Sequence, residues 1–595
     1  MTRRVGLTIL GVLLIVGTTT LAKARAVPTM ITHVDDIGVA VTLLEAQNAA
    51  GPDAVAAALA RHNGHGPLAL LIRTATAVGA APLIAKIGSS LTVPYQWTYA
   101  PAQFLLTGAL LHRGLTYQQL LVRGRLPALL FATLVPLLLA LIGWRLGGER
   151  RAALAWLMAA IGACSIELSL HAAQMENYAL GTLAATGLLF LLVASADVPA
   201  TPRRALGEAC VLAILTWCQY QLLFMVPAYA VARGWQGRRT GATRATVTRA
   251  LLWAALPLAL SSAALYHYFL YLWAGAGVSW NAGPRHEYLF TVPSGAGLAA
   301  TAAYAARFFV SNTVATITAM TAVVPDTSPL ATGLGLLSTA LAVIGIRSMW
   351  RSRTVVDRSV VVLSGTLVII WVGLIGVRAL TLSPTRHALI WLPFLALFIA
   401  RALSAIGSVR VGTVASAASA VLLVTTYRSA MPAVMADRAN PLREPEIVAL
   451  ADSTHADLIV TFACTDDLEL MASLRRPRFH KGCSDLPQYG KFRPAEGADE
   501  PRRILFVNTA APMRPTDFQA LQRSMQVVRE HPVLTHPEST YSRTELRRIA
   551  APGSTEWKRG ITVGGAGLFV TLYALPDAIP SGARRPSQPA PMLPP

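Results

Sequence analysis

Long apolar runs, separated by short polar connections, dominate roughly the first 430 residues. A helix needs about 20 mostly apolar residues to cross the ~30 Å hydrocarbon core of a bilayer. The runs that meet or approach this length are 5–22, 125–144, 152–172, 178–196, 205–217, 221–234, 250–273, 329–346, 359–377, 387–404 and 411–427. The pattern therefore predicts a polytopic α-helical membrane protein with about eleven transmembrane helices.

The predicted number of transmembrane helices depends on the stretch 205–234, which could form one long helix or two short ones. Arginines in short loops mark the cytoplasmic side of a membrane. A single crossing would place the four arginines between 238 and 249 outside, whereas two crossings with a turn near Gln219 place them inside. We therefore predict two helices, a cytoplasmic N-terminus and an extracytoplasmic segment 428–595.

The first apolar run has a second interpretation. The sequence MTRR, an apolar stretch and then Ala22-Lys23-Ala24 also fit a secretory signal peptide. Both interpretations place the residues that follow on the outer side, so the functional argument is the same for each.

Three long segments are expected on the outer side: 23–124, 274–328 and the C-terminal tail. The first contains amphipathic, alanine-rich pieces, from which we expect outer-loop helices, and the Pro/aromatic stretch PYQWTYAPAQF. The second contains WNAGPRHEYLF.

The tail changes in character after about residue 440. Its pattern predicts a helix near 515–530 and three strands, at Leu458–Ala463, Ile504–Val507 and Leu568–Leu572. We therefore predict a transmembrane domain at 1–430, a small extracytoplasmic (periplasmic) α/β domain at 440–577 and a disordered Pro-rich end at 578–595.

Composition supports burial in a membrane and helps to interpret the net positive charge of the chain. Hydrophobic residues make up 54% of the chain and charged residues only 14%, against about a quarter charged in soluble proteins. The net charge of +21 comes largely from arginine. Because most arginines of the first part fall in the predicted cytoplasmic loops, the charge indicates orientation and not nucleic-acid binding.

The sharpest candidate chemistry is the pair Asp35 and Asp36, which follows His33-Val34 just beyond the first run. The pair could start a solvated loop and cap a helix that begins near Ile37. Few other acidic residues are expected outside before the tail. If the protein performs acid/base chemistry at its outer face, these two are the leading candidates.

A second candidate group is Glu167, His171 and Glu176, at the outer end of the third run. Glu167 and His171 are four residues apart and share a helix face. Ionisable residues within a span are costly and face the interior of the bundle. They are either a hydrogen-bonded pair without chemistry or, with Glu176, groups that support an acceptor or a divalent metal.

Basic residues on the outer side are sparse. Arg125, Arg378, Arg386 and His387 stand at the starts or ends of predicted spans. Arginine suits bidentate phosphate binding, which makes them candidates for a lipid phosphate. The alternative is that these side chains only anchor their helices at the membrane interface.

Several short motifs, taken in order, form one pattern. They are the acidic pair after the first span, Tyr99-Ala100-Pro101, Arg125-Leu126-Pro127, Glu176 between the third and fourth spans, and Arg386-His387 before Leu392-Pro393. In this order the chain resembles the GT-C superfamily of integral-membrane glycosyltransferases. Its nearest likeness is to the glycosyltransferase family 39-like proteins, which include protein O-mannosyltransferases and lipid A aminoarabinose transferases. The resemblance covers roughly residues 1–430.

The resemblance implies transfer of a sugar from a polyprenyl-phosphate donor to an envelope glycan, lipid or protein, at the outer face of the bacterial inner membrane. It implies Asp35 as the general base, Asp36 as its support or as a metal or acceptor ligand, and inversion at the anomeric carbon. No cofactor is implied with certainty, and a divalent metal stays open. Family members commonly carry a lysine near the outer end of the fifth span, where this chain has Thr216-Trp217-Cys218-Gln219-Tyr220.

Two other functions remain open. A transporter or flippase would use Glu167 and His171 within the membrane, although the long outer loops and the lack of an inverted repeat argue against it. A non-catalytic scaffold on the same fold is the third alternative. In the tail, Cys464 and Cys483 are either a disulfide or two free thiols.

Overall fold

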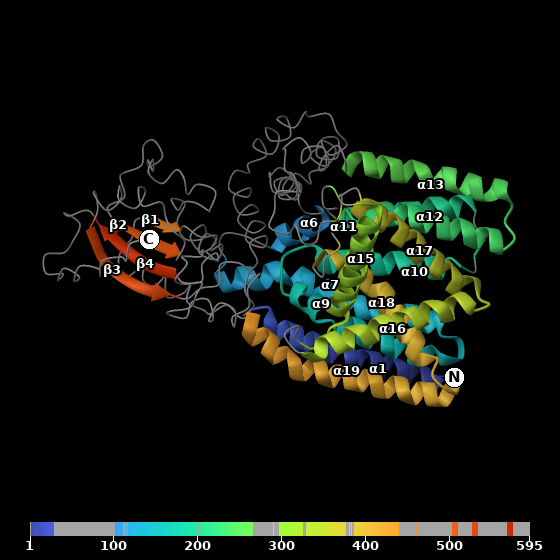
Figure 1. Ribbon diagram of the computed structural model, residues 1–595, viewed down its shortest axis with the longest axis horizontal. Helices are drawn as coiled ribbons and strands as arrows, with labels where there is room; N and C mark the ends of the chain where they lie inside the picture. The colour runs from blue at the N-terminus through green and yellow to red at the C-terminus, as the bar shows by residue number, and fades with distance from the viewer. Residues whose placement is uncertain are drawn as a thin grey trace, which may run out of the picture. The chain divides into compact units, whose positions relative to one another are not determined.

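The computed structural model describes most of the chain up to residue 438 and four strands beyond it (Figure 1). The described residues are 2–28, 101–110, 115, 117–196, 198–199, 201–265, 290, 295, 297–324, 329–376, 380, 382, 386–438, 458–461, 503–509, 526–533 and 568–574. The chain forms two compact units, one helical and one that contains the strands.

Within the described ranges, the helical unit contains α-helices of 6 to 30 residues and two short 3-10 helices. They are α1 (Thr2–Ala26), α6 (Pro101–Leu110), α7 (Tyr117–Leu146), η2 (Gly148–Arg150), α8 (Arg151–Ala163), α9 (Ile166–His171), α10 (Tyr178–Ala194), α11 (Pro202–Cys218), α12 (Leu222–Arg239), α13 (Arg244–Leu265), α15 (Leu298–Thr321), α16 (Pro329–Arg351), α17 (Val355–Gly376), η6 (Arg386–Trp391), α18 (Leu392–Ser404) and α19 (Val409–Arg438).

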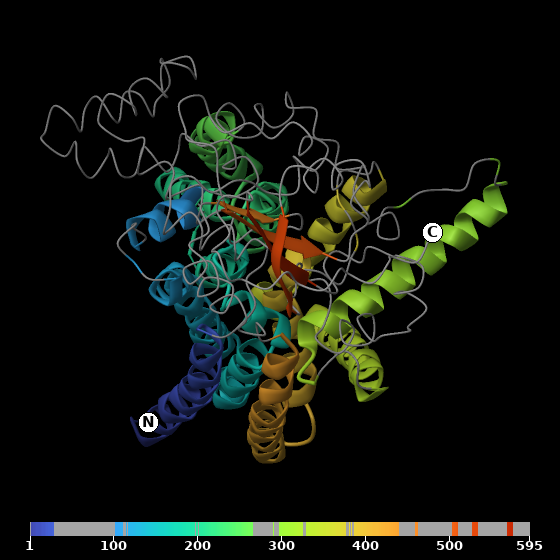
Figure 2. The ribbon, with the colours of Figure 1, turned by 90° about the vertical axis from the view of Figure 1, so that its left-hand side faces the viewer.

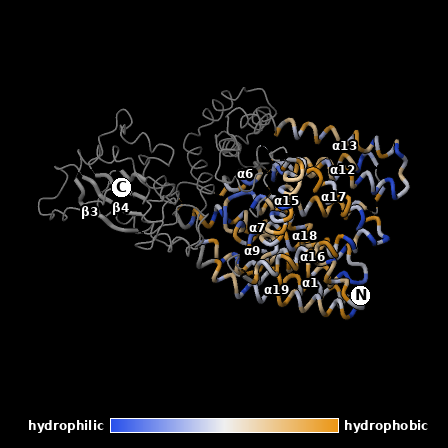
Figure 3. The backbone as a smooth tube through the Cα atoms, viewed as in Figure 1, coloured by the Kyte–Doolittle hydropathy of each residue, from blue (hydrophilic) through white to orange (hydrophobic). Residues whose placement is uncertain are grey.

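In the described part of the chain, seven helical segments are long and apolar enough to cross a membrane. They are Val5–Ala26, Gln119–Leu146, Arg244–Ala263, Leu330–Arg351, Val355–Gly376, Arg386–Ser404 and Val409–Val434. Many of their large apolar side chains point outward, such as Leu14, Leu252 and Ile369, which are 61%, 66% and 73% exposed. Figure 3 shows hydrophobic colour along these helices. An apolar outer surface of this kind indicates an α-helical protein embedded in a membrane.

The centre of the unit is packed from α7, α8, α10 and α18. Side chains such as Val135, Leu157, Leu189 and Leu397 have no exposed surface. Helix α18 is buried along almost its whole length. These inner helices hold the turns in which the candidate site residues lie.

One predicted span, 152–172, is wrong as a continuous helix. The helix breaks at Cys164 and Ser165, and α9 begins again at Ile166. Ser165 has an extended backbone, and its hydroxyl accepts a hydrogen bond from the Leu168 amide, which is the geometry of an N-cap. The apolar run continues through the break, so the periodicity alone does not reveal it.

The prediction of two helices in 205–234 is confirmed. Helix α11 ends at Cys218, and α12 begins at Leu222 after a turn that contains Gln219. Neither helix, nor the 17-residue α10, is among the seven described helices that are long and apolar enough to cross a membrane. Eleven spans therefore stay a prediction.

Helix α15 was not predicted, because 274–328 was expected to be an outer segment without a span. It runs across the other helices instead of along them (Figures 1 and 2). The start of α9 contacts the end of α15, where the Ser165 hydroxyl donates to the Met320 carbonyl at 2.9 Å.

The arginine-bearing connections gather at one end of the bundle, which we call the Arg-rich end. Arg150, after α7, donates to the carbonyls of Ser404 and Gly407 before α19. Arg401, near the end of α18, pairs with Asp357 at the start of α17 at 2.7 Å. Hydrophilic colour marks the connections at this end in Figure 3.

The second unit contains a four-stranded sheet of order β1-β2-β4-β3. The strands are β1 (Leu458–Thr461), β2 (Arg503–Thr509), β3 (Gln526–Val533) and β4 (Leu568–Ala574). β1 pairs with β2 in parallel, and β4 pairs antiparallel with both β2 and β3.

Three of the strands confirm the sequence prediction, but the end of the predicted helix 515–530 is wrong. Residues 526–530 belong to β3 and pair with β4. The valines of QVVREHPV favour a strand once a partner strand is present. Residues 515–525, which carry the rest of this predicted helix, lie outside the described residues, as does the Pro-rich end 578–595.

Candidate functional site

Two connections meet at the end of the bundle opposite the Arg-rich end. One is the turn between α9 and α10, which carries Glu176, and the other is η6, which carries Arg386 and His387. α10 links this turn to Ser195, whose hydroxyl lies against Arg204 at the Arg-rich end. The site is therefore separated from the Arg-rich end by the length of α10.

The central contact is an ion pair. Arg386 Nη1 lies 3.2 Å from Glu176 Oε1, and the Glu176 side chain is fully buried. The Arg386 guanidinium also lies over the Tyr178 ring, with Cζ 5.3 Å from the centroid. Because a buried carboxylate is costly without a cation, and a guanidinium is held well by an aromatic face, these contacts fix Arg386 in one position.

Two histidines flank this pair. His171 Nε2 lies 3.3 Å from Glu167 Oε1, and its Nδ1 lies 4.0 Å from Glu176 Oε2. The hydroxyl of Tyr178 lies 3.4 Å from His387 Nδ1. The expected contact between Glu167 and His171 on one helix face is confirmed.

Tyr178 holds the group together, and the sequence reasoning missed it. Its ring lies 5.2 Å from the His171 ring and 5.3 Å from the His387 ring. Tyr178 is the first residue of α10, two positions after Glu176. The sequence signal that could have indicated it is an aromatic residue two positions after the acidic residue of the turn.

The group holds two carboxylates, one guanidinium and two imidazoles. Side chains of these types can transfer protons, and a guanidinium can hold an anion.

A second contact fixes the turn that carries Glu176. Asn177 Nδ2 donates to Gln219 Oε1 at 3.1 Å, and the same oxygen accepts from the Tyr220 amide at 3.1 Å. A Cβ atom at Gly181 would approach the Gln219 side chain to 3.0 Å. Gln219, predicted only as a turn position, therefore also packs against the start of α10.

Arg125 of α7 is close to the turn that carries Glu176, since a Cβ atom at the neighbouring Gly124 would lie 2.6 Å from Met175 Sδ. Its side chain has no exposed surface, and Nη1 donates to the Val27 carbonyl at 2.6 Å. This contact ties the end of α1 to α7. Part of the guanidinium therefore serves the packing of two helices, a role the sequence reasoning did not foresee.

Several predicted residues lie outside the described residues. They are Asp35, Asp36, Arg378, Cys464 and Cys483. Their predicted roles stay predictions. In the described ranges, no group of three or more His, Cys, Asp or Glu side chains is arranged to hold a metal ion.

Comparison with known proteins adds no family assignment. Neither a protein-family model nor a curated protein sequence matches the chain.

Proposed function

We propose that this protein is an inverting glycosyltransferase that uses a polyprenyl-phosphate sugar. The observation that carries the proposal is the fixed Glu176–Arg386 pair, with His171 and His387 around it, at the end of the bundle opposite the arginine-rich connections. The order of short motifs from the acidic pair to Arg386-His387 gives it further support.

The reaction needs one base and one cationic group. The acceptor hydroxyl oxygen attacks the anomeric carbon, the bond from that carbon to the phosphate oxygen breaks, and Asp35 takes the hydroxyl proton. The lipid phosphate leaves with the bonding electrons. Since the phosphate is already a weak base, it needs positive charge more than a proton, and Arg386 supplies this charge.

The neighbours of Arg386 determine how well its guanidinium is positioned against the leaving phosphate. Glu176 and Tyr178 hold the guanidinium in one orientation and restrict its motion. His387 is the next residue along the chain and adds positive charge when protonated. Asp36, Glu167 and His171 support the acceptor or a divalent metal, and Arg125 and Arg378 are further candidates for the lipid phosphate.

We propose eleven spans in a bacterial inner membrane, with the N-terminus in the cytoplasm and the α/β domain in the periplasm. The Arg-rich end faces the cytoplasm in this arrangement, as the distribution of arginine favours. The acceptor is an envelope glycan, lipid or protein.

The decisive experiment compares envelope glycans in a deletion strain complemented with variants. Wild type restores a glycan that is lost on deletion, and Asp35→Asn with Asp36→Asn does not. Asp53→Asn, which removes another acid of the same outer segment, is the matched control and restores it. Full restoration by the Asp35/Asp36 double variant, at equal protein level, rejects the mechanism.

A transporter or flippase is the second candidate, and one observation favours it. Glu167, His171 and Glu176 form an acid–imidazole–acid series that runs from a partly exposed Glu167 to a buried Glu176, and such series conduct protons in transporters. Flux of a lipid-linked sugar into vesicles, without any transferred product, would support this function over the transferase. A scaffold function predicts neither product nor flux.

A further inference from the structure

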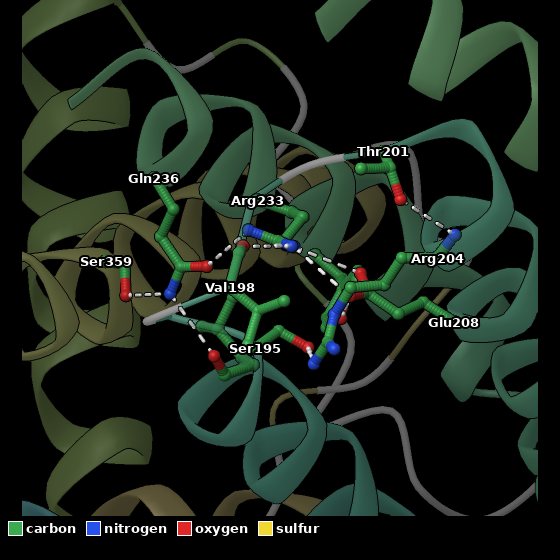
Figure 4. Close-up of polar contacts among 10 residues, drawn as sticks. Ser195, Val198, Thr201, Arg204, Glu208, Arg233, Gln236 and Ser359 are labelled. Atoms are coloured by element: carbon green, nitrogen blue, oxygen red, sulfur yellow. Dashed lines mark hydrogen bonds and ion pairs between the residues drawn. The ribbon is translucent and has the colours of Figure 1, made fainter. Parts of the chain in front are cut away.

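A second buried ionic cluster lies at the Arg-rich end, far along α10 from the candidate site. Its centre is Glu208 of α11 (Figure 4). Arg204 Nε donates to Glu208 Oε1 at 3.0 Å, and Arg233 Nε donates to Oε2 at 3.1 Å. The Tyr229 hydroxyl also donates to Oε2, at 3.0 Å.

The cluster is anchored to the neighbouring helices. Arg233 Nη2 donates to the Val198 carbonyl and Nη1 to Gln236 Oε1. Gln236 in turn donates to Ser359 Oγ of α17 at 2.7 Å. Figure 4 shows these side chains converging from α11, α12 and α17, with Val198 in the connection between α10 and α11. The guanidinium positions are therefore set by the fold and do not depend on a ligand.

The cluster carries one excess positive charge. Two guanidiniums face one carboxylate, and in the described part of the chain no second carboxylate pairs with either of them. Arg233 and Glu208 are 9% and 7% exposed at the side chain, while Arg204 is 34% exposed. The excess charge is thus accessible from outside only at Arg204.

An apolar cavity of about 50 Å³ borders the same cluster, between α11, α12 and α13. Glu208, Tyr229 and Arg233 stand at its polar part. Most of the remaining wall consists of small or aliphatic residues, including Ala209, Leu212, Ala230, Ala250, Ala254 and Leu258.

The cavity lies next to the lipid-facing side of α13. Leu251, which lines it, is 42% exposed, and Leu252 and Leu256 of the same helix are 66% and 62% exposed. In a membrane an apolar recess at such a surface is filled by hydrocarbon. Arginines 238, 239, 244 and 249, all exposed, follow α12 or begin α13 at the same end.

We propose that this place is a binding site for an anionic glycerophospholipid of the leaflet at the Arg-rich end. The headgroup phosphate lies against the exposed part of Arg204, and a segment of one acyl chain enters the cavity between α11 and α13. Charge complementarity supports the assignment, because basic pockets between helices at a membrane surface bind anionic headgroups. The site is separate from the proposed transferase site and does not rest on it.

The test measures lipid retained by the purified full-length protein in native mass spectrometry, with phosphatidylglycerol against phosphatidylcholine. Wild type retains phosphatidylglycerol preferentially. Arg204→Gln lowers this retention about tenfold, whereas Arg353→Gln, which removes an exposed charge elsewhere at the same end, leaves it within about twofold.

A second pair of variants tests the cavity. Ala254→Leu fills the recess and lowers retention, while Ala255→Leu adds the same volume at an exposed position and does not. Equal losses in Arg204→Gln and Arg353→Gln would show non-specific attraction to the basic surface and overturn the site. Unchanged retention in Ala254→Leu would overturn the placement of the acyl chain, as would equal retention of both lipids by wild type.

Discussion

Glu176 Oε1 and Arg386 Nη1 lie 3.2 Å apart although 210 positions separate the two residues in the chain. The pair joins the turn before α10 to η6 before α18. The sequence analysis predicted the acidic turn with Glu176 and the Arg386-His387 motif as separate candidates, and this pair brings them into contact.

Loss of both partners of this pair should cost less than the sum of the two single losses. Arg386→Gln removes a cation from the buried Glu176 carboxylate, and we expect the free energy of unfolding to fall by about 3 kcal/mol. For Glu176→Gln together with Arg386→Gln, the free energy of unfolding should fall by less than the sum of the two single changes. Thermal unfolding of the four proteins in detergent measures this coupling, and additive effects would contradict the pairing.

We expect loss of the buried Glu208 carboxylate to destabilise the protein much more than loss of the exposed Glu149 carboxylate at the same end. Glu208→Gln leaves two guanidiniums with weaker acceptors, and we expect a loss of about 3 kcal/mol in the free energy of unfolding. Glu149→Gln changes an exposed residue of η2 and should stay within about 0.5 kcal/mol of wild type. Equal stability of the two variants would argue against the network in Figure 4.

Gly345 should tolerate no side chain, because a Cβ atom there would overlap the Phe398 carbonyl of α18. We expect Gly345→Ala to separate α16 from α18 and to lower the unfolding temperature in detergent. Gly365→Ala, where a Cβ meets nothing within 4 Å, should be neutral or should stabilise α17 by up to about 1 kcal/mol through helix propensity. A harmless Gly345→Ala would contradict the close packing of these two helices.

Orientation can be checked with reporter fusions in bacteria. Alkaline phosphatase fused after Arg353 should be inactive, because the Arg-rich end is expected in the cytoplasm. The same enzyme fused after Pro595 should be active in the periplasm. Activity of the first fusion and inactivity of the second would reverse the proposed orientation.

Apolar periodicity predicted most helices of the first unit, and arginine placement predicted the turn at Gln219. Both signals are local, so they can be recognised in a single sequence. The helix break at Ser165 depends on a cap and on contacts with α15, and it leaves the apolar run intact. β3 depends on its pairing with β4, which the local sequence does not specify.

Only those contacts of the site that depend on local spacing were predicted from the sequence. Glu167 and His171 share a helix face and were paired from their spacing. The contact of Glu176 with Arg386 and the position of Tyr178 between two histidines arise from the packing of distant segments. No spacing rule in the sequence brings these residues together.

The short length of α10 has a consequence for where chemistry occurs. At 1.5 Å per residue its 17 residues extend about 25 Å, some 5 Å less than the hydrocarbon thickness. If α10 crosses the membrane with Ser195 and Arg204 at one headgroup level, its Glu176 end lies about 5 Å short of the opposite headgroup level. An acceptor hydroxyl and a lipid phosphate would then both have to move inward from that surface to meet at Arg386.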